Sequence, residues 1–385
     1  MPNNLKKINQ KYDKLKRIQS YSSENKSVLI IGGGYMGKEY SHALEKLGIS
    51  DVTIITKSQK QSSDFSEKFD YTVLDGGFEK HLPNMKQKDL VIISTPTELL
   101  MPVTKLSIET GQTKILIEKP GSLFYKELIS LNEIIQQQKV RIAYNRLLYP
   151  NFHKLLQLAK DEGGITSCKF DFTEWTHKIP FDVYQENEYT FWGISNSLHV
   201  ISMALELIGM PKQINSYQFG KLDWHPSGSI FTGSGISDEN IPFSYHANWE
   251  SSGRWLIEIM TKKNSYRLLP LESILVCKKG TIEWKSVDFE SSFPDLKFGI
   301  AEQIVTMLDD QLEDHFFQPN EKNANPRKCP TCDDGRLGLK LAKTGPFIGC
   351  SNYPDCKYAT QLTSNINGDN QNGSGISLPK ELGVD

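Results

Sequence analysis

Residues 28–37 read Val-Leu-Ile-Ile-Gly-Gly-Gly-Tyr-Met-Gly, and they are the strongest indication of the fold. Its four apolar residues predict a buried parallel strand, and Gly32, Gly34 and Gly37 then match the pattern G-x-G-x-x-G. In that pattern the first glycine permits a tight turn. The second lets a pyrophosphate approach the backbone, and the third lets the next helix pack closely on the strand. A bare glycine turn is the alternative, but the flanking strand and helix favour a dinucleotide site at a helix N-terminus.

The chain that follows alternates between strand-like and helix-like segments. Strands are predicted at 51–56, 91–94, 114–117 and 140–144, with helices between them, for example at 41–47 and 123–138. Because strands alternate with helices, we expect an α/β domain over 28–145 with a parallel, doubly wound Rossmann sheet. Residues 1–27 predict a helical extension, from apolar residues at three- and four-residue spacing.

The end of the second predicted strand bears on which dinucleotide is bound. It reads Ile-Thr-Lys-Ser at 55–58, with no Asp or Glu between Thr53 and Gln61. A site for NAD usually offers an acidic residue there to the ribose 2′-hydroxyl, whereas basic or hydroxyl residues accommodate a 2′-phosphate. Lys57 and Ser58 therefore favour NADP over NAD, unless both are simply exposed loop residues.

Two polar segments follow later strands, at the sheet edge where open α/β sheets bind their ligands. The first is Ser-Thr-Pro-Thr at 94–97, and the second is Glu-Lys-Pro at 118–120. Pro120 disfavours a helical conformation at Lys119. A lysine at this edge can donate to a carbonyl or alcohol oxygen and stabilise a developing alkoxide. A solvated surface lysine is the alternative.

From residue 146 to 317 the pattern changes to a second domain. A helix at 152–160 precedes strand-like runs at 167–176, 213–219, 243–250, 254–261, 265–269, 274–277 and 281–284, and residues 299–313 predict a closing helix. Short turns join several of these runs. We expect an α+β domain with a mostly antiparallel sheet that carries helices on one face.

These motifs, in this order and spacing, resemble the Gfo/Idh/MocA oxidoreductases over about residues 28–317. The Glu-Lys-Pro segment is the most specific element, and Ala-Tyr-Asn-Arg at 143–146 resembles the family's crossover into its second domain. The resemblance implies hydride transfer between a nicotinamide cofactor and a hydroxyl or carbonyl group of a sugar, polyol or nucleotide-linked sugar. It implies a catalytic role for Lys119, and oligomers formed through the open face of the second sheet.

A second catalytic candidate, His199, lies in Ser-Leu-His-Val-Ile at 197–201, which opens an apolar helix ending near Gly209. This helix resembles the one that presents a catalytic histidine in the family, and an imidazole can relay a proton near neutral pH. The family often has an Asp four residues earlier, where this chain has Ser195. That departure puts the acid–base pair in doubt, and a core histidine is the alternative. The predicted cofactor-binding residues are Gly32, Gly34, Tyr35, Met36, Gly37, Lys57, Ser58, Thr95, Pro96, Glu118 and Lys119.

The end of the chain predicts a metal site. After a polar linker at 318–328, cysteines pair as Cys329 with Cys332 and Cys350 with Cys356. Four thiolates on turn-rich knuckles suit a tetrahedral structural zinc ion, and a fold of this size depends on such a ligand for its stability. We therefore expect a zinc ribbon over 329–360, followed by a disordered tail rich in Asn, Gly and Ser at 361–385.

This ribbon resembles the C-terminal zinc ribbon of bacterial type IA DNA topoisomerases, which implies contact with single-stranded DNA. The span 335–349 is basic, and Phe347, Tyr353 and Tyr358 lie in or near it. Cations with aromatic faces suit single strands, although the aromatic residues could instead cover the metal core. Residues 1–317 leave no room for the strand-cleaving domains, so DNA relaxation is not expected.

Composition sets broader limits. The net charge of −2 gives no global field for nucleic acid, and no run of about 18 apolar residues predicts a membrane span. The N-terminus has no apolar core of a secretory signal, and four of the six cysteines gather in the ribbon, so a reducing cytoplasm is expected. Two hypotheses follow. One is an NAD(P)-dependent oxidoreductase with an appended ribbon, and the other is a nucleic-acid-binding ribbon on an inactive Rossmann scaffold.

Overall fold

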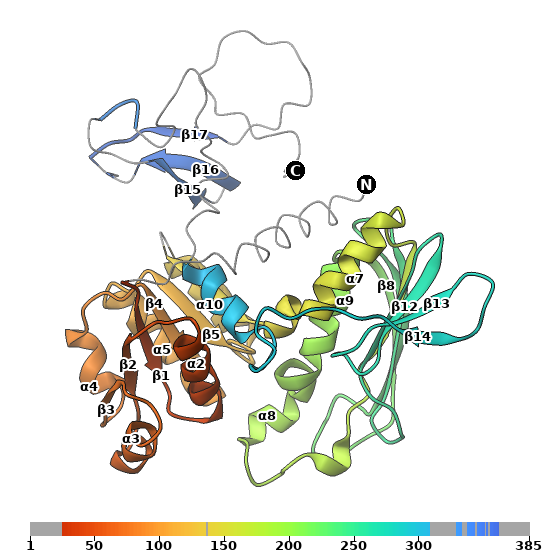
Figure 1. Ribbon diagram of the computed structural model, residues 1–385, viewed down its shortest axis with the longest axis horizontal. Helices are drawn as coiled ribbons and strands as arrows, with labels where there is room; N and C mark the ends of the chain where they lie inside the picture. Colours follow the sequence, from red (N-terminus) through yellow and green to blue (C-terminus); the bar gives the residue numbers. More distant parts are fainter. Residues whose placement is uncertain are drawn as a thin grey trace.

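The computed structural model describes residues 25–135, 138–308, 329–332, 337–342, 345–350, 352 and 355–361. The predicted linker at 318–328 and nearly all of the predicted N-terminal extension and C-terminal tail lie outside these residues. Figure 1 shows two larger bodies, one around each of the first two sheets. No helix among the described residues is long and apolar enough to span a membrane.

The first domain is a six-stranded sheet in the order β3-β2-β1-β4-β5-β6, with every pair parallel. Its strands are β1 (Ser27–Ile31), β2 (Asp51–Ile55), β3 (Thr72–Leu74), β4 (Leu90–Ile93), β5 (Lys114–Glu118) and β6 (Lys139–Ala143). Its helices are α2 (Tyr35–Lys46), α3 (Gln59–Ser66), α4 (Phe78–His81), α5 (Thr97–Glu109) and α6 (Tyr125–Ile134), with a 3-10 turn at Leu82–Asn84. This arrangement confirms the predicted doubly wound sheet.

Both faces of this sheet are covered, which explains why its central strands are continuously apolar. In β1, Val28 and Ile30 belong to the core under α2, whereas Leu29 and Ile31 belong to the core on the opposite face, with residues of α5. All four side chains are at most 1% exposed. The carboxyl ends of β1, β4 and β5 therefore lie side by side at one edge, where the predicted site residues are placed.

The second domain is an eight-stranded sheet in the order β14-β13-β12-β11-β7-β10-β9-β8. Its elements are a 3-10 turn (Asn145–Leu148), α7 (Pro150–Asp161), β7 (Ser167–Asp171), a 3-10 turn (Thr176–Lys178), α8 (Glu186–Thr190), a π-helical turn (Gly193–Ser197), α9 (Leu198–Ile208), β8 (Pro211–Phe219), β9 (Ile230–Ser237), β10 (Pro242–Asn248), β11 (Leu256–Met260), β12 (Asn264–Leu268), β13 (Leu275–Lys278) and β14 (Trp284–Ser286). All strand pairs are antiparallel except β7 with β10, which confirms the predicted, mostly antiparallel sheet.

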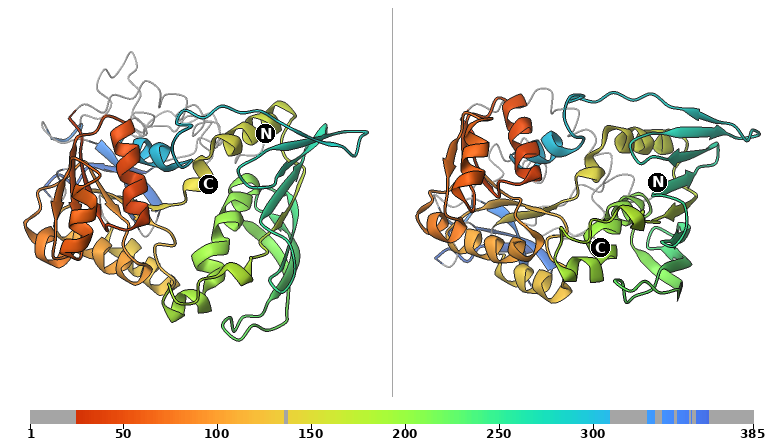
Figure 2. Two further views of the ribbon diagram at one scale, coloured as in Figure 1. Left: turned by 60° about the horizontal axis from the view of Figure 1, so that its bottom comes forward. Right: turned by 90° about the horizontal axis from the view of Figure 1, so that it is seen from below.

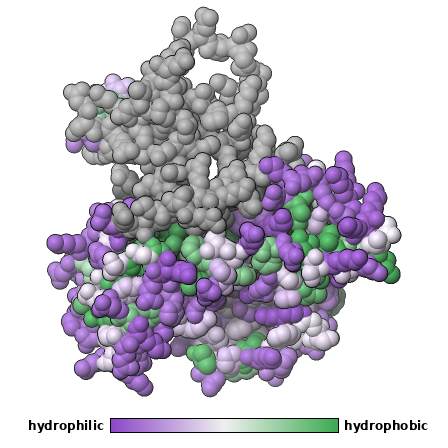
Figure 3. Space-filling view, in the orientation of Figure 1, coloured by the Kyte–Doolittle hydropathy of each residue, from purple (hydrophilic) through white to green (hydrophobic). Residues whose placement is uncertain are grey.

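The helices of the second domain lie on the side of its sheet that faces the first domain (Figures 1 and 2). Trp249 is 1% exposed within the core between α9 and the sheet. The other face is more open, and Tyr217 and Phe219 on β8 are 62% and 59% exposed. Elsewhere hydrophilic residues cover much of the described surface in the view of Figure 3.

Strand β9 has no counterpart among the predicted strands, because its sequence, Ile-Phe-Thr-Gly-Ser-Gly-Ile-Ser, is typical of a loop. The fold explains its two central glycines. A Cβ atom at Gly233 would lie 2.6 Å from the Tyr245 ring, and one at Gly235 would lie 2.8 Å from the Phe243 ring. Aromatic rings of β10 and the carbonyl oxygens of Asn215 and Gln213 on β8 therefore occupy the space of the missing side chains, and the glycines are a packing requirement.

The predicted closing helix is α10 (Ile300–Leu308), and it packs on the first domain. Its apolar side joins the core under α2, with Ile300, Ile304 and Met307 each at most 1% exposed. Lys139 of β6 donates to the carbonyl oxygens of Thr306 and Met307 at 2.8 and 3.1 Å. The chain thus crosses to the second domain near residue 145 and returns, so the predicted span 146–317 includes a helix of the first domain.

The third sheet contains β15 (Leu337–Ala342), β16 (Gly345–Cys350) and β17 (Ala359–Gln361), all antiparallel. It carries the last two cysteines, one at the end of β16 and one shortly before β17. This is the predicted small ribbon domain.

Candidate active site and metal centre

The glycine turn has the geometry that a dinucleotide needs. Gly32 has a positive φ of 118°, and a Cβ atom there would lie 2.5 Å from the Ser94 carbonyl oxygen. A Cβ at Gly37 would lie 2.2 Å from the Gly32 carbonyl oxygen, so close packing of α2 on the turn requires glycine. At Gly34 a Cβ would meet nothing within 4 Å. Open space at the uncapped N-terminus of α2, where no side chain covers the N–H groups, suits a pyrophosphate.

The residues predicted to select the dinucleotide lie just beyond β2. Ser58 is the N-cap of α3, and its hydroxyl accepts the Gln61 N–H at 3.4 Å. Lys57 is exposed. The end of β2 adjoins the glycine turn, because the Gly32 N–H donates to the Ile55 carbonyl oxygen at 2.9 Å. The end of β2 therefore lies beside the turn that would hold the pyrophosphate.

The Glu-Lys-Pro segment begins in a buried hydrogen-bonded group at the end of β5. The Tyr40 hydroxyl of α2 donates to Glu118 Oε1 at 2.7 Å and lies 3.2 Å from Gln303 Oε1 of α10. Burial raises the pKa of Glu118, although the Tyr40 hydroxyl and the Lys119 ammonium oppose that shift. Lys119 and Pro120 are joined by a cis peptide bond. Three separate elements thus fix the start of this segment.

Lys119 joins the two domains. Its Nζ donates to the carbonyl oxygen of Ser195 at 2.9 Å. Ser195 lies in the π-helical turn that precedes α9, and it is 3% exposed. Burial lowers the pKa of the Lys119 ammonium, against the opposing charges of Glu118 and Glu188. The ammonium therefore lies in a desolvated position between the sheet edge and α9, rather than on the solvated surface of the alternative interpretation.

His199 lies one helical turn beyond Ser195, and its imidazole interacts with several of the same charges as Lys119. Burial holds the pKa of its imidazole well below 6.5, and the Lys119, Arg146 and Lys297 cations act in the same direction. Its Nδ1 is buried without a hydrogen-bond partner among the described residues, and its ring lies 5.9 Å from that of Trp255. A neutral imidazole with an unused nitrogen beside Lys119 can serve as a hydrogen-bond donor or acceptor to a ligand.

Several residues around His199 were not predicted from the sequence. Buried Glu174 accepts hydrogen bonds from Asn196, Ser197, Arg254 and Trp255, at 2.6 to 3.2 Å. It therefore fixes the turn before α9 against the β11 side of the domain. Its only sequence signal is a carboxylate near the end of the strand-like run at 167–176, in Phe-Thr-Glu-Trp at 172–175, which is no recognised motif.

The ring of Trp255 lies close to two arginine side chains. The Arg254 and Arg146 guanidinium carbons lie 4.2 and 5.2 Å from its centroid. Each arginine is also ion-paired, Arg254 with Glu174 at 2.9 Å and Arg146 with Glu272 at 2.6 Å. These pairs hold both guanidinium groups in place next to the indole.

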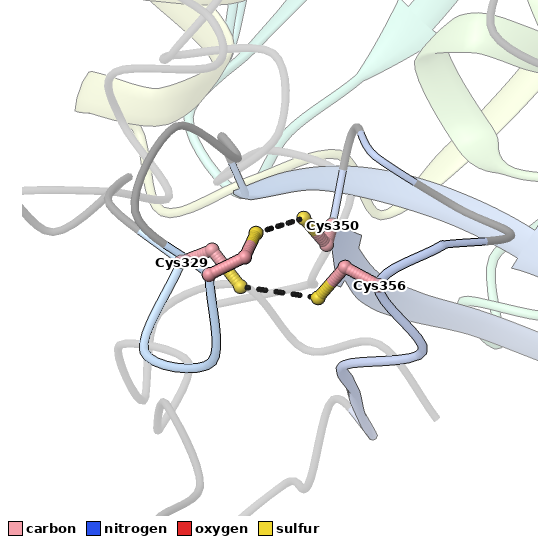
Figure 4. Close-up of side chains that lie close together, drawn as sticks. Cys329, Cys350 and Cys356 are labelled. Carbon is pink, nitrogen blue, oxygen red and sulfur yellow. Dashed lines mark hydrogen bonds between the residues drawn. The ribbon is translucent and has the colours of Figure 1, made fainter.

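The four cysteines lie together as predicted for zinc. The Sγ atoms of Cys329 and Cys356 are 3.7 Å apart, those of Cys332 and Cys350 are 3.5 Å apart, and all four lie within 4.8 Å of one another. Tetrahedral zinc with bonds of about 2.3 Å places its sulfurs about 3.8 Å apart, so the spacing fits. The sulfurs point toward one another between two turns (Figure 4), and none forms a disulfide.

Each half of this centre has the N–H···S bonds of a metal-binding knuckle. The Thr331 N–H donates to Cys329 Sγ, and the Asn352 N–H donates to Cys350 Sγ, both at 3.4 Å. Such bonds compensate negative charge on the sulfurs. The four cysteines are thus positioned to hold a structural zinc ion.

Comparison with known proteins identifies two separate regions. Residues 26–146 match the model of the Gfo/Idh/MocA oxidoreductase family with an NAD-binding Rossmann fold. Residues 326–365 match the model of the topoisomerase DNA-binding C4 zinc finger.

The curated relatives match only part of the chain. DNA topoisomerase 1 of Rickettsia conorii is 33% identical over 115 residues, which are 28% of this chain and 14% of the topoisomerase. The Zymomonas mobilis topoisomerase 1 is 38% identical over 85 residues, 20% of this chain and 7% of its own. This chain therefore spans a small part of the length of these enzymes.

Solved structures show the same two-domain fold. An NADPH-dependent oxidoreductase described from Desulfitobacterium hafniense superposes with a TM-score of 0.61 at 16% identity, over 74% of this chain and 86% of its own. Levoglucosan dehydrogenase with NADH and L-sorbose gives 0.56 at 17% identity, over 72% and 82%. UDP-N-acetylglucosamine 3-dehydrogenase of Acidithiobacillus ferrooxidans gives 0.55 at 15% identity, over 73% and 87%. Residues 26–146 thus match an NAD-binding Rossmann domain of the Gfo/Idh/MocA oxidoreductase family, the first two domains share the fold of these oxidoreductase structures, and residues 326–365 match a topoisomerase-type C4 zinc ribbon.

Proposed function

We propose that the protein is an NAD(P)-dependent oxidoreductase that transfers a hydride between nicotinamide and a hydroxyl or carbonyl group of a sugar, polyol or nucleotide-linked sugar. The observation that carries this proposal is the position of Lys119. Its desolvated ammonium lies at the carboxyl edge of the parallel sheet and contacts the turn that precedes His199. The sugar dehydrogenases with the same fold support this substrate class.

The roles of the side chains follow from their charges. Bound NAD(P)H supplies the hydride that a carbonyl carbon accepts, and the oxygen then needs a proton. Lys119 is placed to donate a hydrogen bond and that proton to the oxygen, and its charge stabilises the developing alkoxide. Neutral His199 orients the substrate through a hydroxyl group or relays the proton. In the direction of oxidation, the neutral amine of Lys119 accepts the proton.

The carboxylate that the family often places before its histidine is replaced by Ser195, and the structure offers another acid close by. The Ser195 hydroxyl donates to the backbone carbonyl of Glu188 at 3.3 Å. The Glu188 carboxylate interacts with the Lys119 ammonium and hydrogen-bonds Thr97 at the start of α5. Burial raises the pKa of Glu188. An acidic group thus remains near Lys119, so we expect the serine to change the pair without abolishing activity.

For the cofactor we propose a preference for NADP, supported by Lys57 and Ser58 beyond β2. A clear preference for NADH over NADPH in steady-state kinetics would overturn this choice.

The test of the main proposal has two steps. Titration with NADPH and NADH, followed by fluorescence, is expected to show saturable binding. A screen of sugars, polyols and nucleotide sugars, read at 340 nm, is then expected to reveal turnover that Lys119→Ala removes. Binding without turnover of any of these would favour an inactive scaffold, and absence of nucleotide binding would reject the proposal.

A second function is favoured by the match of the ribbon to a DNA-binding zinc finger. We propose that the ribbon contacts single-stranded DNA, in addition to the reaction of the first two domains. Retention of the full chain on immobilised single-stranded DNA is expected, and removal of zinc by a chelator should abolish it. Retention that survives chelation would assign DNA binding to another part of the chain or reject it.

The open face of the second sheet is the proposed surface for a homo-oligomer, as the family resemblance implies. Tyr217 and Phe219 are the exposed aromatic residues of β8 on this face that would be covered. Tyr217→Asp is expected to shift the oligomer to monomer in analytical ultracentrifugation. A wild-type protein that sediments as a monomer at micromolar concentration would reject this assembly.

A further inference from the structure

We propose that Lys297 binds the pyrophosphate of the dinucleotide cofactor, which adds a contact from the far end of the chain to the glycine turn. This inference rests on the proposed function, because it names a further residue of the same cofactor site. Lys297 lies in the segment that returns from the second domain to α10, about 260 residues after the turn. Neither the G-x-G-x-x-G pattern nor the matched family region includes it.

The position of the Lys297 ammonium leads to this assignment. Its Nζ lies 3.5 Å from Met36 Sδ and 4.9 Å from the centre of the Tyr35 ring. Tyr35 and Met36 are the first two residues of α2, directly after Gly34. The ammonium therefore lies at the same helix N-terminus whose open space, above Gly34, suits a pyrophosphate.

The segment that carries Lys297 is held on both sides. Asp295 forms an ion pair with Lys46 of α2 at 3.6 Å, and Leu296 packs against the core under that helix. After Lys297, the Phe298 carbonyl oxygen accepts the Asn145 side-chain amide at 3.1 Å. A Cβ atom at Gly299 would lie 2.1 Å from the Asn145 carbonyl oxygen, so this contact requires glycine. The backbone at Lys297 is therefore positioned before any ligand binds.

The Lys297 charge favours the ionised form of buried Glu118, but no carboxylate is in direct contact with the ammonium among the described residues. Within the described residues Lys297 makes no ion pair, and its neighbours are a thioether and an aromatic ring. The first turn of α2 contains no acidic residue. The Lys297 charge also adds to the positive potential at Lys119 and His199. A pyrophosphate is negatively charged, so both this ammonium and the helix N-terminus would stabilise it.

The experiment measures binding of NADPH, NADH and ADP-ribose to the full chain by titration calorimetry. Lys297→Ala is expected to weaken all three by about tenfold or more, because each ligand contains the pyrophosphate and a charge-assisted hydrogen bond is lost. Lys297→Arg should retain most of the affinity. Lys262→Ala, an exposed lysine in the β11–β12 turn, is the matched control and should bind as the wild type does. The loss in Lys297→Ala should shrink at high salt.

The outcomes separate this inference from the proposed function. If the wild type binds the dinucleotides and Lys297→Ala binds them equally well, the inference is wrong and the proposed function stands. A loss confined to NADPH would place Lys297 at the 2′-phosphate and overturn the assignment, as would a loss confined to ligands that contain nicotinamide. A wild type that binds none of the three rejects the proposed function and the inference together. An unchanged thermal midpoint of Lys297→Ala confirms that the variant is folded.

Discussion

Lys119 Nζ donates a hydrogen bond to the carbonyl oxygen of Ser195 at 2.9 Å, across 76 positions of sequence. This bond joins the end of β5 in the first domain to the turn that opens α9 in the second. The acceptor is a backbone atom, so the identity of side chain 195 does not decide whether the bond forms. A substrate oxygen can compete for the same ammonium, which has three donors.

Removal of the Lys119 ammonium tests the proposed chemistry. Lys119→Ala is expected to lower kcat by about 10²- to 10⁴-fold, the usual range for a general acid or base. The Kd for NADPH should change little, because the glycine turn remains intact. Lys119→Arg keeps the charge but is a poor proton donor, and it is the matched variant. Turnover of Lys119→Ala equal to that of the wild type would exclude the role.

The pH dependence of the wild type should report the same group. Burial lowers the pKa of Lys119 below its ordinary 10.5. Substrate oxidation, which needs the neutral amine, is therefore expected to rise with pH through an apparent pKa below that value, and reduction should fall over the same range. A guanidinium group does not titrate in this range, so Lys119→Arg should lose this limb of the kcat/KM profile. A limb that persists in the variant would belong to another group.

His199 is expected to act as a neutral imidazole. Because its pKa lies well below 6.5, the rate should show no inflection near pH 6.5 that is due to this residue. His199→Ala should lower kcat/KM for the substrate by about tenfold or more, with His199→Gln retaining part of it through its amide. Both variants should bind NADPH normally. A purely structural histidine would instead alter thermal stability and leave kcat/KM of the folded fraction unchanged.

Two glycines of the turn provide a matched pair. Gly37→Ala is expected to destabilise the fold, because its Cβ would lie 2.2 Å from the Gly32 carbonyl oxygen. At Gly34 a Cβ meets no protein atom within 4 Å, so Gly34→Ala should fold normally yet bind the dinucleotide more weakly. Thermal unfolding and NADPH titration separate the two effects. Normal affinity in folded Gly34→Ala would show that the pyrophosphate does not approach this position.

Glu302 at the start of α10 predicts a pH dependence of stability. Burial raises its pKa from 4.5 to about 7, although backbone N–H groups oppose the shift. Between these values the folded state holds a proton that the unfolded state lacks, so stability falls as pH rises from 4.5 to 7. Glu302→Gln should be more stable than the wild type by about 1–3 kcal/mol at pH 8 and nearly equal at pH 4. Denaturant unfolding at both values checks this, and an equal difference at both would contradict it.

The first domain could be predicted closely from the sequence, because its signals are local. Apolar runs followed by glycine or proline segments place β1, β4 and β5 and bring Gly34, Thr95 and Lys119 to one sheet edge. The position of α10 could not be predicted, because the amphipathic pattern of 299–313 does not specify which domain it covers. Glu174 and Trp255 also escaped prediction, since their importance lies in contacts with residues 22 and more positions away. Similarly, the glycines of β9 are explained by contacts with its two neighbouring strands, which the local sequence does not specify.

The return of α10 to the first domain affects how the protein can be made. Ile300, Ile304 and Met307, with their neighbours in and just before α10, complete a core whose remaining residues come from the first 143 positions. On the ribosome, the nucleotide-binding sheet therefore emerges with an open apolar face, and that face stays open until the entire second domain has been synthesised. A fragment cut at residue 146 would keep this exposed face permanently, and we expect it to aggregate unless α10 is supplied as a separate peptide.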